Sequence, residues 1–169
     1  MIVVTGGSAS GKSAFAEDYL VKACPGKKLY IATMKPYDKE SFSRIFRHQK
    51  MREKKDFSTL ECYYNLKEAS IEPGCGILLE CMSNLVANEM FLLGKDSDQI
   101  VEEVLEGLEK LEKQAKLLVV VTNEIFQDGK VYEESTKNYQ ECLARINKQM
   151  AKRAKKLAEV VYGIALWLK

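Results

Sequence analysis

Residues 6–13, Gly6-Gly7-Ser8-Ala9-Ser10-Gly11-Lys12-Ser13, decide the fold of this chain. They fit the phosphate-binding loop pattern, in which Gly and four further residues precede Gly-Lys and then Ser or Thr. The β-branched run Ile2–Thr5 before the loop predicts a buried strand, and residues 14–22 after it predict a helix. A strand, a loop and a helix in this order predict a cradle for the phosphates of a nucleoside triphosphate.

The residue types of this loop explain the chemistry that it predicts. Its glycines permit backbone angles that turn successive N–H groups toward phosphate oxygens, and the following helix adds the positive end of its dipole. Lys12 is expected to reach the β- and γ-phosphates, and the Ser13 hydroxyl to bind Mg²⁺. The competing interpretation is a glycine-rich turn with a chance Gly-Lys-Ser, which the flanking strand and helix disfavour.

Composition narrows the class of protein further. The chain has 169 residues, which predicts a single domain over residues 1–169 with a substantial core. Its net charge is only +2, from 26 basic and 24 acidic residues, and this balance argues against a protein built mainly to grip nucleic acid. No apolar run approaches the ~20 residues that span a bilayer, and we expect no signal peptide because the first residues already form the predicted strand.

The cysteines favour a reducing compartment. Five cysteines are scattered without a C-x-x-C pair, at Cys24, Cys62, Cys75, Cys81 and Cys142. An odd, unpaired set without an export signal predicts reduced thiols in the cytoplasm. A structural zinc site is not expected, because the chain has one histidine and no clustered thiols.

Alternating strands and helices predict an α/β fold of the P-loop NTPase type. Further strands are expected at 28–33, 76–81, 117–122 and 160–168, with a weaker one at 58–62. Helices are expected at 37–52, 82–93, 98–116 and 137–158, and a loop around 127–129. Continuously apolar strands between helices predict a mainly parallel sheet with helices on both faces, and ligands beyond the carboxyl ends of its strands.

Polar residues follow several of these strands at the predicted ligand edge. Glu80 ends a strongly apolar strand, where P-loop enzymes place a second handle on magnesium or its waters. Thr33 ends another strand, and Thr122-Asn123-Glu124 follows a third. For Asn123 and Glu124, structural hydrogen bonding is an equally good interpretation.

His48 is the only histidine of the chain and lies in its most basic stretch. That stretch contains Arg44, Arg47, Lys50, Arg52, Lys54 and Lys55. A solvated helix face is the usual meaning of such a run. The alternative is that the cations hold anions while a neutral imidazole attacks phosphorus, because most imidazole is unprotonated at pH 7.

Other P-loop classes lack their motifs here. A GTPase switch would carry Asn-Lys-x-Asp and Asp-x-x-Gly, and the nearest string, residues 147–150, lacks the Asp. A motor or DNA-dependent ATPase would need more length or a basic surface. A small-molecule kinase or a nucleotidyltransferase fits the size and the loop best.

Several motifs in order resemble the bifunctional adenosylcobinamide kinase/adenosylcobinamide-phosphate guanylyltransferase family of cobalamin biosynthesis. The matching pieces are V-T-G-G-S-A-S-G-K-S at 4–13, Y-I-A-T at 30–33, R-I-F-R-H at 44–48 with Arg52, T-L-E at 59–61, L-L-E-C at 78–81, V-T-N-E at 121–124 and Asn147. The resemblance runs almost end to end. It implies a RecA-like fold and a homo-oligomer, with a trimer as the implied form and the active site near a subunit boundary.

The resemblance implies two reactions and assigns residues to them. A nucleoside triphosphate, GTP or ATP, phosphorylates adenosylcobinamide with Mg²⁺, and a histidine matching His48 then takes GMP from GTP and passes it to adenosylcobinamide phosphate. Lys12 and His48 are implied as the catalytic residues, and Ser13 and Glu80 as the metal contacts. The implied nucleotide contacts are Gly6, Gly7, Ser8, Ala9, Ser10, Gly11, Lys12, Ser13, Ala32, Thr33, Met34, Gln49, Lys50, Met51, Arg52, Glu61 and Glu80.

Two other functions stay open at this point. The first is a P-loop kinase of another small alcohol or nucleoside, with His48 outside the chemistry. The second is a regulatory GTP-binding module without transfer chemistry, which the missing guanine and switch motifs disfavour.

Overall fold

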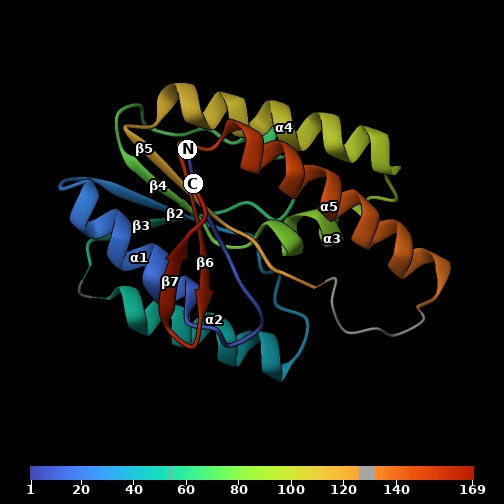
Figure 1. Cartoon of the computed structure of the whole chain (residues 1–169), viewed down its shortest axis with the longest axis horizontal. Helices are drawn as coiled ribbons and strands as arrows, with labels where there is room; N and C mark the ends of the chain where they lie inside the picture. The colour runs from blue at the N-terminus through green and yellow to red at the C-terminus, as the bar shows by residue number, and fades with distance from the viewer. Residues whose placement is uncertain (54, 126–131) are drawn as a thin grey trace.

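The computed structural model of the chain describes residues 1–53, 55–125 and 132–169. Within these ranges seven strands form one sheet in the order β3-β2-β4-β5-β1-β6-β7 (Figure 1). The strands are β1 (Ile2–Thr5), β2 (Lys28–Ala32), β3 (Phe57–Glu61), β4 (Gly76–Leu79), β5 (Leu117–Val121), β6 (Lys156–Val161) and β7 (Ile164–Trp167). The β6–β7 pair is antiparallel and every other pair is parallel. The loop expected around 127–129 lies outside the described residues.

Helices cover both faces of this sheet, as the sequence predicts (Figure 1). The helices are α1 (Lys12–Ala23), α2 (Lys39–Arg52), α3 (Met82–Phe91), α4 (Ser97–Gln114) and α5 (Glu134–Arg153), with a short 3₁₀ turn η1 (Leu66–Glu68). α1 and α2 lie on one face, and α3, α4 and α5 on the other. Asp38 caps α2 and Asp96 caps α4 through side-chain bonds to backbone N–H groups.

Strand periodicity divides the core into two layers. Val3, Ile31 and Ile77 face α3, α4 and α5 in one buried cluster. Val4 and Leu78, one residue along, face α1 in the other. Because successive strand residues point to opposite faces, a strand covered on both sides must be apolar at every position, which is the pattern that the sequence shows.

The end of the chain differs from the prediction. The sequence predicts a helix over 137–158 and a strand over 160–168, whereas α5 ends at Arg153 and a β6–β7 hairpin follows. Ala154 has an extended backbone with ψ 137°, and Ala158 pairs with Val4 of β1. Burial against β1 therefore overrides the helical propensity of this lysine- and alanine-rich segment.

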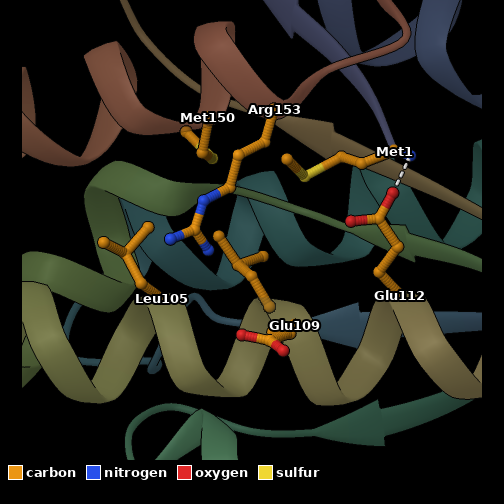
Figure 2. A pocket seen from close by; sticks show the side chains of 7 residues that line it. Met1, Leu105, Glu109, Glu112, Met150 and Arg153 are labelled. Carbon is orange, nitrogen blue, oxygen red and sulfur yellow. Dashed lines mark hydrogen bonds and ion pairs between the residues drawn. The ribbon is translucent and has the colours of Figure 1, made fainter.

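A cavity of about 250 Å³ lies at the amino end of β1, between α4 and α5 (Figure 2). Its lining residues are Met1, Leu105, Leu108, Glu109, Glu112, Met150 and Arg153. The Met1 ammonium group forms an ion pair with Glu112 there. Ligands of such sheets bind beyond the carboxyl ends of the strands, so this cavity is on the wrong side for the predicted site.

Two features of composition have structural counterparts. No helix in the described ranges is long and apolar enough to cross a membrane. All five cysteines are buried thiols.

A Gly107→Ala variant is expected to lose up to about 2 kcal/mol of unfolding free energy. Alanine favours a helix by about 1 kcal/mol over glycine, but a Cβ at this position of α4 would lie 2.9 Å from the Lys67 backbone nitrogen. Overpacking typically costs about 1–3 kcal/mol, so the clash outweighs the propensity. Urea unfolding measures the loss, with exposed Glu102→Ala on the same helix as control; a stabilised Gly107→Ala protein would contradict the packing.

Candidate active site

The loop at residues 6–13 has the backbone of an anion cradle. It follows β1 and leads directly into α1, whose N-cap is Gly11. Ala9 and Gly11 have positive φ angles of 58° and 92°. The predicted strand, loop and helix are therefore confirmed, and backbone N–H groups and the α1 dipole meet at one point.

Two polar side chains of the loop are buried, which is unusual for a lysine and for a hydroxyl without a partner. The Lys12 ammonium is nearly buried and donates to the Gly7 carbonyl at 2.9 Å, across the loop. Burial lowers the pKa of Lys12 below its ordinary value. The Ser10 hydroxyl is buried without a hydrogen-bond partner among the described residues. A buried cation and an unsatisfied hydroxyl in one loop fit a site for a polar anionic ligand.

The β6–β7 turn supports the loop from the side. The Gly163 N–H donates to the Ser10 carbonyl at 2.8 Å, and the turn depends on positive φ angles of 51° at Tyr162 and 80° at Gly163. Trp167 of β7 packs on Phe15 of α1, with ring centroids 5.9 Å apart. The hairpin that the sequence prediction missed is thus part of the frame of the phosphate loop.

A second group of predicted site residues meets at the ends of β2 and β4. The Glu80 Oε2 atom accepts hydrogen bonds from the backbone N–H groups of Thr33 at 3.0 Å and Met34 at 3.2 Å. The Thr33 hydroxyl donates to the Cys81 carbonyl at 2.9 Å. These bonds hold the ends of β2 and β4 together. Glu80 therefore fixes the backbone after β2 and also places a carboxylate at this edge of the sheet.

These strand ends and α2 enclose a cavity of about 420 Å³. It is lined by Tyr30, Ala32, Met34, Pro36, Phe42, Ile45, Phe46, His48, Gln49, Arg52, Thr59, Glu61, Tyr63 and Glu80. The apolar side of α2 therefore faces this cavity and solvent rather than the core; Phe42 and Phe46 are 59% and 67% exposed. Six of the nucleotide contacts implied by the resemblance, Ala32, Met34, Gln49, Arg52, Glu61 and Glu80, share this one space with His48.

His48 is held from one edge of its ring. Its Nδ1 atom lies 3.1 Å from the Tyr30 hydroxyl and 3.3 Å from Glu80 Oε1. Burial alone would raise the pKa of Glu80, but hydrogen bonds from His48 and Tyr30 and from the Met34 N–H outweigh it, and the pKa lies below its ordinary value. The carboxylate is therefore charged beside the imidazole.

Other predicted residues lie outside this cavity. Lys50 is exposed on α2, and nothing is described for the Met51 side chain. The Thr122 hydroxyl donates to Asn147 Oδ1 at 2.7 Å, which brings two motifs of the resemblance into contact. Asn123 donates to the Ser83 hydroxyl, a hydrogen bond of the structural kind expected as one of its two interpretations.

The loop and the cavity share one edge of the sheet but no lining residue. β5 and β4 separate β1 from β2, which places the two strands about 14 Å apart at the usual spacing. Among the described residues no group of three His, Cys, Asp or Glu side chains could hold a metal by itself.

The sequence does not predict the α3 residues that fix the loops beside the cavity. Asn88 of α3 donates from Nδ2 to the carbonyls of Thr33 and Tyr63, both at 2.9 Å. The neighbouring Glu89 accepts from the Asn65 N–H at 2.6 Å. One helix thus ties down the loops after β2 and β3. The sequence contains a signal for these residues: Asn88 and Glu89 are polar residues in a mainly apolar helix, and such residues are expected to bond to buried partners.

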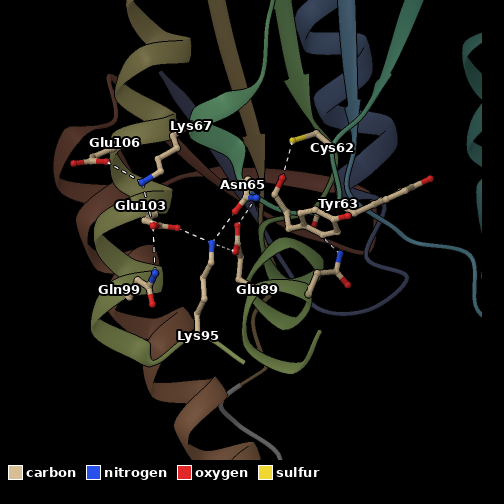
Figure 3. A network of polar contacts seen from close by, with 11 residues as sticks. Cys62, Tyr63, Asn65, Lys67, Glu89, Lys95, Gln99, Glu103 and Glu106 are labelled. Carbon is tan, nitrogen blue, oxygen red and sulfur yellow. Dashed lines mark hydrogen bonds and ion pairs between the residues drawn. The ribbon is translucent and has the colours of Figure 1, made fainter. Parts of the chain in front are cut away.

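Glu89 belongs to a polar network that includes Lys95 and Glu103 (Figure 3). Lys95 Nζ lies 2.6 Å from a carboxylate oxygen of each acid and 2.8 Å from Asn65 Oδ1. The Glu89 side chain is 1% exposed. Its charge is tolerated there because the lysine and a backbone N–H compensate it.

A Lys95→Met variant is expected to lose about 3–5 kcal/mol of unfolding free energy, because Glu89 would keep a buried charge without its cation. Denaturant unfolding measures the loss. Adding Glu89→Gln should restore part of it, because the amide carries no charge to be stranded. A single variant as stable as the wild type would contradict the compensation.

Comparison with known proteins gives matches over the whole chain. A family model described as "Cobinamide kinase / cobinamide phosphate guanyltransferase" matches residues 2–168. The "Bifunctional adenosylcobalamin biosynthesis protein CobU" of Escherichia coli (strain K12) is 32% identical over 183 residues, covering 100% of this chain and 99% of that protein. The protein of the same name from Salmonella typhimurium (strain LT2) matches to the same extent.

Comparison with solved structures confirms the fold. One of them, an ATPase domain, aligns with a TM-score of 0.51 at 7% identity, covering 94% of this chain and 68% of that one. At this identity the likeness concerns the fold alone. The expected RecA-like P-loop architecture, with a mainly parallel sheet, is therefore confirmed.

Proposed function

The chain belongs to the cobinamide kinase / cobinamide phosphate guanyltransferase family, and from this premise we propose how its residues serve the two reactions. The enzyme phosphorylates adenosylcobinamide and transfers GMP from GTP to adenosylcobinamide phosphate. We assign phosphate binding to the loop at 6–13 and nucleotidyl transfer to His48. The observation that carries the assignment is the position of His48 in one cavity with Glu61 and Glu80.

The kinase reaction needs charge stabilisation around the γ-phosphate. Lys12 and the N–H groups of the loop supply it, because they are preoriented donors at a helix start. The Ser10 hydroxyl gains a partner when a phosphate enters. Mg²⁺ would be held by Ser13 and phosphate oxygens, where it neutralises phosphate charge. Glu80 would act on the ion through a bound water, because its own oxygens already face Thr33, Met34 and His48.

Electrostatics orient GTP between the loop and the cavity. Glu61 and Glu80 repel a triphosphate, and Glu61 can accept hydrogen bonds from the N–H groups of guanine. The base therefore occupies the cavity, and the β- and γ-phosphates extend toward the loop. Arg52 Nη1, buried without a partner among the described residues, lies on the cavity side. Of the remaining implied contacts, Thr33 is buried beside Glu80, and Lys50 and Met51 stand between Gln49 and Arg52 in sequence.

The transfer proceeds in two steps at His48. The imidazole attacks the α-phosphorus, pyrophosphate leaves, and GMP stays on the ring until adenosylcobinamide phosphate takes it. Splitting the transfer in this way replaces one difficult displacement by two easier ones.

We also propose a homo-oligomer in the cytoplasm. Exposed apolar side chains gather on the terminal hairpin, where Tyr162 is 94% and Ile164 66% exposed. Apolar surface of this kind marks association sites, and a trimer is the form that the resemblance implies. The five buried thiols suit a reducing compartment. Sedimentation of the purified chain tests the assembly.

Labelled nucleotides test the function. With GTP labelled at the α-phosphate, the denatured protein should keep an acid-labile, alkali-stable label, and GTP labelled at the γ-phosphate should leave none. Adenosylcobinamide phosphate should then remove the label and carry it into product. Phosphorylation of adenosylcobinamide by γ-labelled nucleotide tests the kinase. A protein with kinase activity and no covalent label would instead be a P-loop kinase without transferase activity.

A further inference from the structure

We propose that Tyr30 is a positioning residue for His48. Together with Glu80, Tyr30 holds the Nδ1 atom of His48 and leaves Nε2 as the nitrogen that receives GMP. The proposal rests on the nucleophilic role of His48 proposed above. It adds a residue that touches neither reacting atom and identifies which ring nitrogen reacts. Its basis is the approach of Tyr30 and Glu80 to the same nitrogen, at 3.1 and 3.3 Å.

The hydrogen-bond pattern around Nδ1 assigns its proton. Glu80 Oε1 lies 3.3 Å from Nδ1, and a carboxylate can only accept a hydrogen bond. The Tyr30 hydroxyl, 3.1 Å from the same nitrogen, can accept as well as donate. A proton on Nδ1 therefore lets both neighbours accept from it, whereas a bare Nδ1 would face the lone pairs of the carboxylate. In the neutral ring this places the free lone pair on Nε2, on the other edge.

The surroundings of Tyr30 hold its hydroxyl in place. The residue is 2% exposed in β2, and the Arg52 guanidinium lies 3.3 Å from its ring centroid. Phe57 of β3 meets the ring edge-on, with centroids 6.4 Å apart. Burial, and then the Glu80 charge, raise the pKa of Tyr30, so it remains a donor across the working pH range. Packing of this kind gives a reactive group its geometry before substrate arrives.

This arrangement fits the electron flow of the transfer. The Nε2 lone pair forms a bond to the α-phosphorus while the bond from phosphorus to the bridging oxygen breaks, and that electron pair leaves with pyrophosphate. The ring becomes cationic with its proton still on Nδ1, beside the Glu80 charge. In the second step a phosphate oxygen of the acceptor attacks phosphorus and the electron pair returns to Nε2.

A single histidine makes the assignment directly measurable. Histidine labelled with ¹⁵N in the ring alone gives only the two ring nitrogens of His48 in the spectrum, because the chain has no other histidine. In the wild-type protein near neutral pH, Nδ1 should carry the proton. After reaction with GTP, Nε2 should be the nitrogen coupled to phosphorus. A ring proton on Nε2, or phosphorus on Nδ1, would overturn the proposal.

Tyr30→Phe tests the role of the hydroxyl, because it keeps the ring under Arg52 and removes one oxygen. We expect the rate of single-turnover guanylylation to fall about 10–100-fold, the usual effect of losing an orienting partner. The dissociation constant of GTP should not change, and the ring proton should shift toward Nε2. Wild-type rate and proton position in this variant would refute the positioning role.

Tyr139→Phe is the matched control. Its hydroxyl donates to the Ser83 carbonyl at 3.2 Å, away from His48, so the variant loses a similar bond without touching the ring. It should guanylylate at the wild-type rate, which separates orientation from general loss of stability. If the wild type carries the proton on Nδ1 but never acquires GMP, the proposed transferase function fails while the hydrogen-bond assignment stands.

Discussion

Replacement of His48 by alanine is expected to abolish the covalent GMP label on the protein and to lower transfer to adenosylcobinamide phosphate by at least about 10³-fold. The imidazole is the only group proposed to bond phosphorus, and removing a nucleophile eliminates the two-step route. His48 lies on α2 with 21% of its side chain exposed, so the fold should survive the change. Gel detection of α-labelled protein after denaturation measures the result.

Kinase activity distinguishes this result from misfolding. The phosphate loop shares no lining residue with the cavity of His48, so His48→Ala should still phosphorylate adenosylcobinamide. Ser43→Ala, on the exposed side of the same helix, should keep both activities. A persistent GMP label in the alanine variant would place the nucleophile elsewhere.

Lys12→Ala is expected to lower the kinase rate by about 10²–10³-fold, the usual effect of removing one preoriented donor from a developing charge. It should lower guanylylation of His48 as well, because we place the β- and γ-phosphates of GTP in the same loop. Burial lowers the pKa of Lys12, so the loop holds the ammonium at an energetic cost that a phosphate offsets. Removing this cation should therefore not destabilise the free protein.

Rapid-quench assays with γ- and α-labelled GTP measure the two rates, and thermal unfolding checks the fold. The control is Lys22→Ala, an exposed lysine later in α1. If Lys12→Ala lost the kinase reaction but took GMP onto His48 at the wild-type rate, then GTP would not span the loop and the cavity.

The sequence predicts the frame of the site well because local rules decide it. Gly6 to Ser13 lie in a confirmed strand, loop and helix, and the strand-end residues Thr33, Glu61 and Glu80 gather at one edge as parallel topology requires. These placements depend only on backbone order. The roles that we give to the individual side chains remain predictions.

Tertiary packing decides what the sequence could not predict. Tyr30 reads as an ordinary strand residue, and its approach to His48 depends on how α2 crosses the end of β2. The Phe42 and Phe46 stripe has a helical period but faces a cavity and solvent. Residues 156–161 form a strand because β1 offers an unpaired edge, which local propensity does not describe.

The terminal hairpin gives the molecule an intrinsic fluorescent probe. Trp167, the single tryptophan, packs at steep angles against Phe15 and Tyr19 of α1, with its centroid 5.9 and 5.7 Å from theirs. The same hairpin is bonded to the phosphate loop at Ser10, and α1 begins in that loop. Nucleotide titrations can therefore be followed by tryptophan emission in unlabelled protein.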